Sequence, residues 1–285
     1  AESLARRLGV RARFTHAQWS TLGPSLERGD FDVALNGLEA TSDRAERLLL
    51  SRPYFVFAET LTVRRGAPYR SLEDLAGKRV GTLSSTWAHE LLRNGRVEPV
   101  LYEGQEEPYR DLAAGRTEAV LLDDIVADRF GCTRPELECV AAPVSAGAYV
   151  IGMRRTDANL AGAIDRALAE MQRDGELRAI LERWHLWDER QAGRLAGEAL
   201  CKRGVHDLSV VSRTAEHAES LARGWHAVPL PWHALEAAIR DADVVISCTG
   251  APHAVITREL VESALRGRAA GRPLLVADIA VPRDV

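Results

Sequence analysis

The stretch SLEDLAGKRVGTLSST, residues 71–86, places a short helix before a strand and then opens a second helix. KRVGTL, residues 78–83, has the apolar, β-branched character of a strand. SST, residues 84–86, is a cluster of N-cap residue types, which predicts a helix over residues 87–93. A strand that leads directly into a capped helix is typical of an α/β sheet.

The same alternation extends outward over the first 190 residues. The expected strands lie at residues 10–14, 32–35, 54–63, 97–102, 119–122 and 148–153. The expected helices lie at residues 21–28, 157–174 and 175–184. This pattern predicts a parallel α/β sheet that is split into two lobes.

A second α/β pattern begins at Gly204, where the chain starts a new series of short units. Strands are expected at residues 208–211, 227–229, 244–247 and 274–278, and helices at 215–223, 232–240 and 258–267. Strand and helix units of this length are Rossmann-like. We therefore expect an α/β chain with two parts, 1–191 and 192–285.

Composition excludes several classes of function. The 285 residues carry 37 basic and 41 acidic side chains, a net charge of −4, so no concentrated basic face for nucleic acid is expected. No run of 18 apolar residues is present, so no transmembrane helix is expected. The opening AESLARRLGV reads as the middle of an amphipathic helix, so we expect a truncated or processed N-terminus and no signal peptide.

The four cysteines and eight histidines predict no metal site, because they show no CxxC, no HxxxH and no cluster at ligand spacing. Cys132 and Cys139 lie close together in GCTRPELEC. They could form a disulfide in an oxidising compartment or remain two half-buried thiols, and the sequence leaves both alternatives open.

Three motifs in the first part resemble the polar-amino-acid family of bacterial solute-binding proteins: SLEDLAGKRVGTLSST, YRDLAAGRTEAVLLDD and GAIDRALAEMQRDGELRAILERW. The resemblance covers about residues 1–191 and implies the two-lobed fold of periplasmic binding proteins, which closes like a hinge. It implies one lobe at 1–58 and 148–191 and the other at 59–147. The family's first strand and loop, with a second aromatic residue, would precede Ala1, so we expect an N-terminally truncated fold.

An amino-acid carboxylate is held best by a bidentate arginine and by donors at a helix N-terminus. By resemblance, LNGLEATSDR places this arginine at Arg44, with Asn36, Gly37 and Glu39 lining the loop. Without the other motifs, Arg44 would be interpreted as a solvated residue of a first helical turn. Glu39 replaces a hydroxyl that is common in the family, and its carboxylate could favour a cationic ligand side chain or point to solvent.

Three more residues complete the ligand site that the resemblance implies. Thr86 matches a hydroxyl that meets the carboxylate, although it is also a plain N-cap. Asp123 matches the partner of the ammonium group and is likewise a helix-capping residue type. Trp19 matches an aromatic residue that packs on the ligand, whereas a lone aromatic is more often part of a core.

Residues 192–285 resemble glutamyl-tRNA reductase, which reduces glutamyl-tRNA with NADPH. The motifs are LSVVSRTAEHAESLA, ADVVISCTGAPHAVIT and PLLVADIAVPRDV. The resemblance implies an NADP site at two loops, one following the second strand of the fold and one over the nicotinamide. Its residues are Ser212, Arg213, Thr214, Thr249, Gly250 and Ala251.

The glycine loop of a dinucleotide site is not found in this second part. QAGRLAGEAL contains Gly193 and Gly197, but no strand precedes them, and LAGEAL reads as the rest of a first helix. The Cys-Asn-Arg context of the reductase's catalytic cysteine is also absent, so we expect no catalytic residue and no tight cofactor binding. NADPH is the cofactor implied by resemblance.

The leading hypothesis is a polar-amino-acid-binding component of an ABC transporter, whose partner by resemblance is a permease, followed by an inactive, incomplete Rossmann-like segment. One alternative is an NADPH-dependent reductase fragment. Another is a fusion of two gene fragments, because ERWHLWDERQ is followed directly by AGRLAG, with no Gly/Ser/Pro linker between the two parts. The first resemblance implies a periplasmic location and the second a cytoplasmic one.

Overall fold

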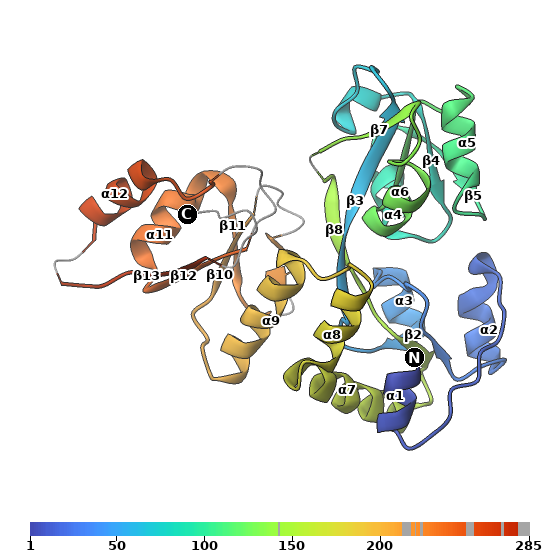
Figure 1. Ribbon diagram of the computed structural model, residues 1–285, viewed down its shortest axis with the longest axis horizontal. Helices are drawn as coiled ribbons and strands as arrows, with labels where there is room; N and C mark the ends of the chain where they lie inside the picture. Colours follow the sequence, from blue (N-terminus) through green and yellow to red (C-terminus); the bar gives the residue numbers. More distant parts are fainter. Residues whose placement is uncertain are drawn as a thin grey trace. The chain divides into compact units, whose positions relative to one another are not determined.

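The computed structural model describes residues 1–141, 143–212, 218–219, 221–222, 225–248, 254–268 and 271–278. The chain divides into two compact units, Ala1–Leu177 and Arg178–Val285. In Figure 1 the first unit runs from blue to yellow and the second from yellow to red.

The strands of the first unit form two sheets. They are β1 (Val33–Ala34), β2 (Leu48–Leu50), β3 (Phe55–Arg64), β4 (Arg79–Leu83), β5 (Glu98–Tyr102), β6 (Ala119–Asp123), β7 (Leu137–Cys139), β8 (Ser145–Tyr149) and β9 (Gly152–Arg154). The small sheet has the order β1-β9-β2, and the large sheet has the order β5-β4-β6-β3-β7 with β8 also paired to β3. We call the parts built on these sheets the small-sheet lobe and the large-sheet lobe.

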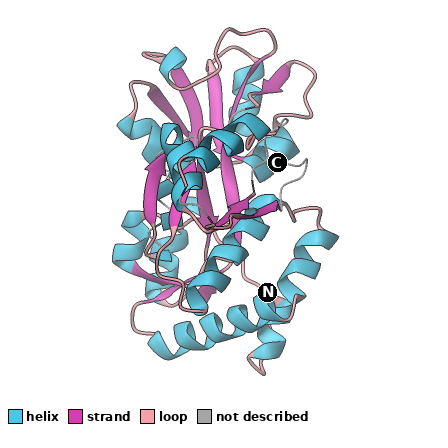
Figure 2. Ribbon diagram, turned by 90° about the vertical axis from the view of Figure 1, so that its left-hand side faces the viewer, coloured by secondary structure: helices cyan, strands magenta, loops and turns pink. Residues whose placement is uncertain are grey.

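Helices cover both sheets (Figures 1 and 2). On the small sheet, α2, α3 and α7 contact the strands and α1 contacts α7, whereas α4, α5 and α6 contact the large sheet. Their bounds are α1 (Glu2–Arg7), α2 (Leu22–Arg28), α3 (Ser42–Arg47), α4 (Trp87–Asn94), α5 (Glu107–Ala113), α6 (Asp124–Phe130) and α7 (Ala158–Arg173). Gly175 follows α7 with φ +82°, a conformation that suits glycine, and α8 (Glu176–Arg183) begins there.

Strand β3 joins the two lobes and organises the large sheet. Its sequence, FVFAETLTVR, is rich in aromatic and β-branched residues and is buried along most of its length. The first half pairs with β8, from Phe55 opposite Tyr149 to Glu59 opposite Ser145. From Glu59 onward the strand pairs with β6 on its other side, where Glu59 lies opposite Asp123. Glu59 is therefore enclosed by strands on both sides.

The structure corrects three expectations for the first unit. Residues 10–14 form no strand, and Val10 and Phe14 are exposed, because no neighbouring strand pairs with this run. The strand expected at 148–153 is two strands, since β8 pairs with β3 whereas β9 pairs with β1 and β2. The large sheet is mixed, because β3 runs antiparallel to β6, β7 and β8 while β4 is parallel to β5 and β6.

The second unit contains two pairs of parallel strands among its described residues, β10 with β11 and β12 with β13. Its elements are α9 (Glu189–Lys202), β10 (Ser209–Ser212), β11 (Val228–Pro231), α11 (Leu235–Asp241), β12 (Val244–Ser247), α12 (Arg258–Arg266) and β13 (Leu275–Asp278). This order confirms the Rossmann-like α/β pattern. Most of the helix expected at 215–223 lies outside the described residues. Among the helices that the structure describes, none is both long and apolar enough to cross a membrane.

Candidate ligand site of the first unit

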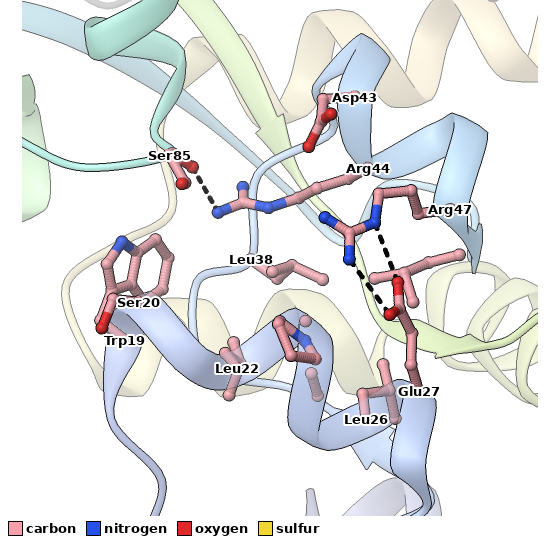
Figure 3. A pocket seen from close by; sticks show the side chains of 14 residues that line it. Trp19, Ser20, Leu22, Leu26, Glu27, Leu38, Asp43, Arg44, Arg47 and Ser85 are labelled. Carbon is pink, nitrogen blue, oxygen red and sulfur yellow. Dashed lines mark hydrogen bonds and ion pairs between the residues drawn. The ribbon is translucent and has the colours of Figure 1, made fainter.

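Arg44 connects the two lobes at the centre of the candidate site. It lies in the first turn of α3, where the Thr41 hydroxyl caps the helix by accepting the Arg44 N–H at 3.4 Å. Its guanidinium donates to the Glu39 carbonyl at 3.0 Å and to the Ser85 carbonyl of the large-sheet lobe at 2.6 Å. Figure 3 shows the guanidinium pointing toward Ser85. The side chain is 12% exposed, so Arg44 is not the solvated helix residue of the alternative interpretation.

Trp19 lies between the small-sheet core and this arginine. The Arg44 guanidinium lies 5.2 Å from the Trp19 ring centroid, a cation–π distance. The indole N–H donates to the Ser84 carbonyl at 2.8 Å, and the ring also packs against the cluster that contains Leu22 and Leu26. Trp19 is thus a half-buried wall of the pocket in Figure 3 and a part of the core at the same time.

Glu39 is buried, with 4% of its side chain exposed. One carboxylate oxygen accepts the backbone N–H of Trp87, the first residue of α4, and lies 3.7 Å from Arg44 Nη1. This geometry excludes the alternative in which Glu39 points to solvent. Burial raises the pKa of Glu39 to about 8, against the opposing effects of the Arg44 charge and the Trp87 N–H.

Thr86 caps α4, as the sequence predicts. Its hydroxyl accepts the His89 N–H at 3.1 Å and donates to the Leu83 carbonyl at 2.8 Å. The preceding residue, Ser85, has φ +57°, a left-handed conformation that is uncommon outside glycine and that often marks a functional turn. This turn presents the Ser84 and Ser85 carbonyls to Trp19 and Arg44.

Asp123 ends β6 and caps α6 by accepting the Val126 N–H at 2.8 Å. The Tyr149 hydroxyl donates a second hydrogen bond to its carboxylate. The residue is 8% exposed. Burial raises the pKa of Asp123 to about 6, which the Val126 N–H and the Tyr149 hydroxyl partly offset.

Gly37 and Asn36, the other two loop residues expected in the site, differ from each other in their surroundings. Gly37 has φ +81°, and its N–H donates to the Tyr54 hydroxyl at 3.3 Å. A Cβ atom at Gly37 would lie 3.6 Å from the Tyr149 ring, so the loop passes close to the aromatic wall. Asn36 is exposed, and its side chain makes no hydrogen bond with the described cluster around Arg44.

Glu59 and Tyr149 belong to this region but are missing from the site predicted from the sequence. Glu59 is fully buried, and neither of its oxygens has a hydrogen-bond partner among the described residues. Burial is the main cause that raises the pKa of Glu59 well above its usual range, and the nearby charges of Glu39 and Asp123 raise it further. An acidic residue inside the apolar run FVFAETLTVR was the available signal. Tyr149, which stacks on Phe57 at 4.7 Å between centroids, gave no comparable local signal.

The cofactor residues implied for the second unit are mostly outside the described residues. Ser212 is half-buried at the end of β10, whereas Arg213, Thr214, Thr249, Gly250 and Ala251 fall outside the described ranges.

Both glycines of QAGRLAGEAL lie inside helix α9. A Cβ atom at Gly193 would overlap the Cys248 side chain, and one at Gly197 would overlap the Trp225 ring. These glycines permit close helix packing and do not form a phosphate-binding loop. Gly193 and Gly197 therefore do not supply a glycine loop for the pyrophosphate of a dinucleotide.

The cysteines resolve an alternative that the sequence left open. Cys132 and Cys139 form a disulfide with a Cα–Cα distance of 5.4 Å, while Cys201 and Cys248 are thiols. Among the described residues, no three His, Cys, Asp or Glu side chains group as ligands for a metal ion.

Comparison with known proteins finds matches for two regions of the chain. Residues 1–186 match the family model of bacterial extracellular solute-binding proteins, family 3, and residues 191–285 match that of shikimate / quinate 5-dehydrogenase. The L-cystine-binding protein TcyJ of Escherichia coli K12 is 31% identical over 189 residues, which is 65% of this chain and 71% of the relative.

A solved ancestral arginine-binding protein bound to glutamine superposes with a TM-score of 0.61 at 29% identity, covering 65% of this chain and 85% of that one. Glutamyl-tRNA reductase of Bacillus pumilus is 45% identical over 93 residues, which is 33% of this chain and 20% of that relative. The chain thus spans a fifth of the reductase.

Proposed function

The chain belongs to family 3 of the bacterial extracellular solute-binding proteins, and we propose that its first unit binds a polar amino acid, or a close relative that keeps the amino group, between the two lobes. In this proposal the chain is the substrate-binding component of an ABC transporter, and a permease is its partner. Residues 1–191 form the binding domain, with the lobe bounds expected from the sequence.

One observation carries the proposal: Arg44 of the small-sheet lobe reaches the turn that opens α4 in the large-sheet lobe, at 2.6 Å from the Ser85 carbonyl. A buried guanidinium and the first N–H groups of a helix are the two kinds of donor that hold a carboxylate best. Their proximity between the lobes makes this the natural place for the polar end of a small solute.

The acidic side chains of the same region support an amino group on the solute. Glu39, Glu59 and Asp123 are all buried, and a buried carboxylate is stabilised when a cation pairs with it. Trp19 lies against Arg44 and adds an aromatic wall to the pocket.

A periplasmic location follows from the same proposal, because the family's relatives are periplasmic binding proteins. The Cys132–Cys139 disulfide supports an oxidising compartment, where such bonds form and persist.

Calorimetric titration of the full chain with arginine, lysine, ornithine, glutamine and cystine tests the proposal. Saturable one-to-one binding of at least one amine-bearing solute is expected. A folded chain that binds no member of such a panel, nor any matching amine, would remove solute binding as its function.

The second unit resembles the NADP domain of a dehydrogenase or reductase, and we propose that it does not reduce glutamyl-tRNA. Two observations support this: Gly193 and Gly197 are used for helix packing, and none of the four cysteines has the Cys-Asn-Arg context. No catalytic step is assigned to this unit.

A further inference from the structure

The carboxylate of Glu39 lies on the donors that a ligand carboxylate would need. It accepts the Trp87 N–H at the start of α4, an eight-residue helix, and it lies 3.7 Å from the Arg44 guanidinium. An N-terminal N–H of a helix and an arginine are the two kinds of donor that hold a carboxylate best. The chain therefore places one of its own carboxylates in the subsite that an amino acid would use.

The backbone holds Glu39 in this place. Glu39 forms an isolated antiparallel bridge with Tyr149, and its neighbours Leu38 and Ala40 hydrogen-bond to Val150 and Ala148 at 2.8 and 2.9 Å. The carbonyl of Glu39 also accepts from Arg44 at 3.0 Å. The side chain is thus fixed by its own backbone on the side of Arg44 and is not a mobile surface group.

Arg44 keeps N–H groups for a carboxylate, but the Glu39 carboxyl group already lies beside them. Nη1 donates to the Glu39 carbonyl and Nη2 to the Ser85 carbonyl, and the Glu39 carboxylate is 3.7 Å from Nη1. A ligand carboxylate would share the site with the buried Glu39 carboxyl group, and two carboxyl groups in one site cannot both ionise without repulsion.

The charge around Glu39 points to the type of ligand. The charged side chains that act on it are Arg44, Asp123 and Glu90, and Glu59 is influenced in turn by Glu39 and Asp123. Burial raises the pKa of Glu39, Glu59 and Asp123, and Glu59 lies opposite Asp123 in the sheet. An organic cation would favour the ionised form of these groups by pairing with it, whereas a zwitterion brings a further carboxylate into the same region.

We propose that Glu39 itself fills the carboxylate subsite, so that the chain selects small aliphatic amines without an α-carboxylate over the corresponding amino acids. This inference rests on the proposed solute-binding function and defines its substrate class. Asp123 and the adjacent acidic groups would receive the amine, while Arg44 keeps Glu39 in place.

Matched pairs of ligands that differ only in the carboxylate provide the test: agmatine against arginine, and cadaverine against lysine. Calorimetry on the full chain should give at least about ten-fold tighter binding of the amine, a difference of roughly 1.4 kcal/mol. In Glu39→Ser, which removes the internal carboxylate, the preference should reverse in favour of the amino acid.

Two further variants keep the result interpretable. Glu39→Gln retains the shape and an acceptor for the Trp87 N–H but has no charge, so the amine preference should shrink. Glu46→Gln changes an exposed acid of α3, the helix that carries Arg44, and should leave the preference unchanged. Thermal unfolding of each variant shows whether it is folded.

A wild-type chain that binds arginine or lysine more tightly than its amine, with the same ranking in Glu39→Ser, would overturn the inference and leave the proposed solute binding intact. If folded wild type and Glu39→Ser bind neither member of either pair, and no other amino acid binds, solute binding itself fails.

Discussion

Arg44 and Ser85, 41 residues apart in sequence, are joined by a hydrogen bond of 2.6 Å from the guanidinium to the backbone carbonyl. The contact connects α3 to the turn before α4 and so crosses from the small-sheet lobe to the large-sheet lobe. Ser85 has the left-handed conformation at that turn. The contact between the lobes and the proposed ligand site therefore share the same arginine.

Arg44→Ala should weaken the binding of the best ligand by about 100-fold, because it removes the charge that holds Glu39 and the contact to the Ser85 carbonyl, and one hydrogen bond to a charged group contributes about 1.5–3 kcal/mol. Calorimetry with the best ligand of the panel measures the change. Arg28→Ala is the matched control, since Arg28 is a 60% exposed arginine of the same lobe paired with Asp30. Unchanged affinity in Arg44→Ala would remove Arg44 from the site.

Asp123→Asn should separate the two roles of this residue. Asparagine caps a helix about as well as aspartate, so stability should change by less than about 1 kcal/mol. The charge that receives the amino group is lost, and affinity should fall by about 10- to 100-fold. Denaturant unfolding and calorimetry on the same sample give both values. Asp111→Asn, which changes a half-buried carboxylate of the same lobe that pairs with Tyr102 and Arg116, is the control for affinity.

The stability of the first unit should decrease as the pH rises from about 4.5 to about 8. The pKa of Glu39 is raised by burial from 4.5 to about 8, and those of Asp123 and Glu59 are raised for the same reason. Between these pH values the folded state therefore binds more protons than the unfolded state. The stabilisation is fully present below about pH 4.5 and is lost as the pH rises to about 8. Thermal unfolding at a series of pH values measures the slope.

Glu59→Met should flatten this pH dependence, because it removes a fully buried carboxyl that has no hydrogen-bond partner among the described residues. At pH 8 the free energy of unfolding should increase by about 1–3 kcal/mol, the usual cost of an unsatisfied buried polar group. Glu98→Gln, an exposed acid on β5, should leave the slope as it is. A destabilised Glu59→Met at pH 8 would contradict this account.

The disulfide predicts the pattern of thiol labelling. The unfolded, unreduced chain should take up two labels, at Cys201 and Cys248, and the reduced chain four. Replacing Cys132 and Cys139 by serine should cost about 2.5 kcal/mol from loop-closure entropy alone. Mass spectrometry and denaturant unfolding test the two parts, and four labels without reductant would show that the bond is absent.

NADPH should bind the chain weakly or not at all, and glutamyl-tRNA should not be reduced. With Gly193 and Gly197 packed inside α9, the pyrophosphate has no glycine loop among the described residues. A single solvent-exposed ion pair between an arginine and a phosphate would contribute only about 0–1 kcal/mol to the binding free energy. Fluorescence titration and a turnover assay, with an intact reductase as positive control, decide the matter. Tight saturable binding would contradict the prediction.

Local sequence signals predicted much of the fold and part of the site. The order of strands and helices follows from periodicity, and the caps at Thr86 and Asp123 follow from residue type, because a capping side chain bonds to backbone two or three residues away. The change from the first α/β pattern to the second, near Gln191, is also visible in short stretches of sequence.

The tertiary structure alone decided the surroundings of the charged groups and the direction of the central strand. Glu39 meets the N–H of Trp87, 48 residues away, and Glu59 is enclosed because β8 and β6 pair on either side of β3. The sequence left two alternatives open for Glu39 and two for the cysteine pair. It also predicted a strand at residues 10–14, where no second strand pairs with the chain in the structure. Burial and pairing depend on which distant segments meet, and this information is absent from any short stretch of residues.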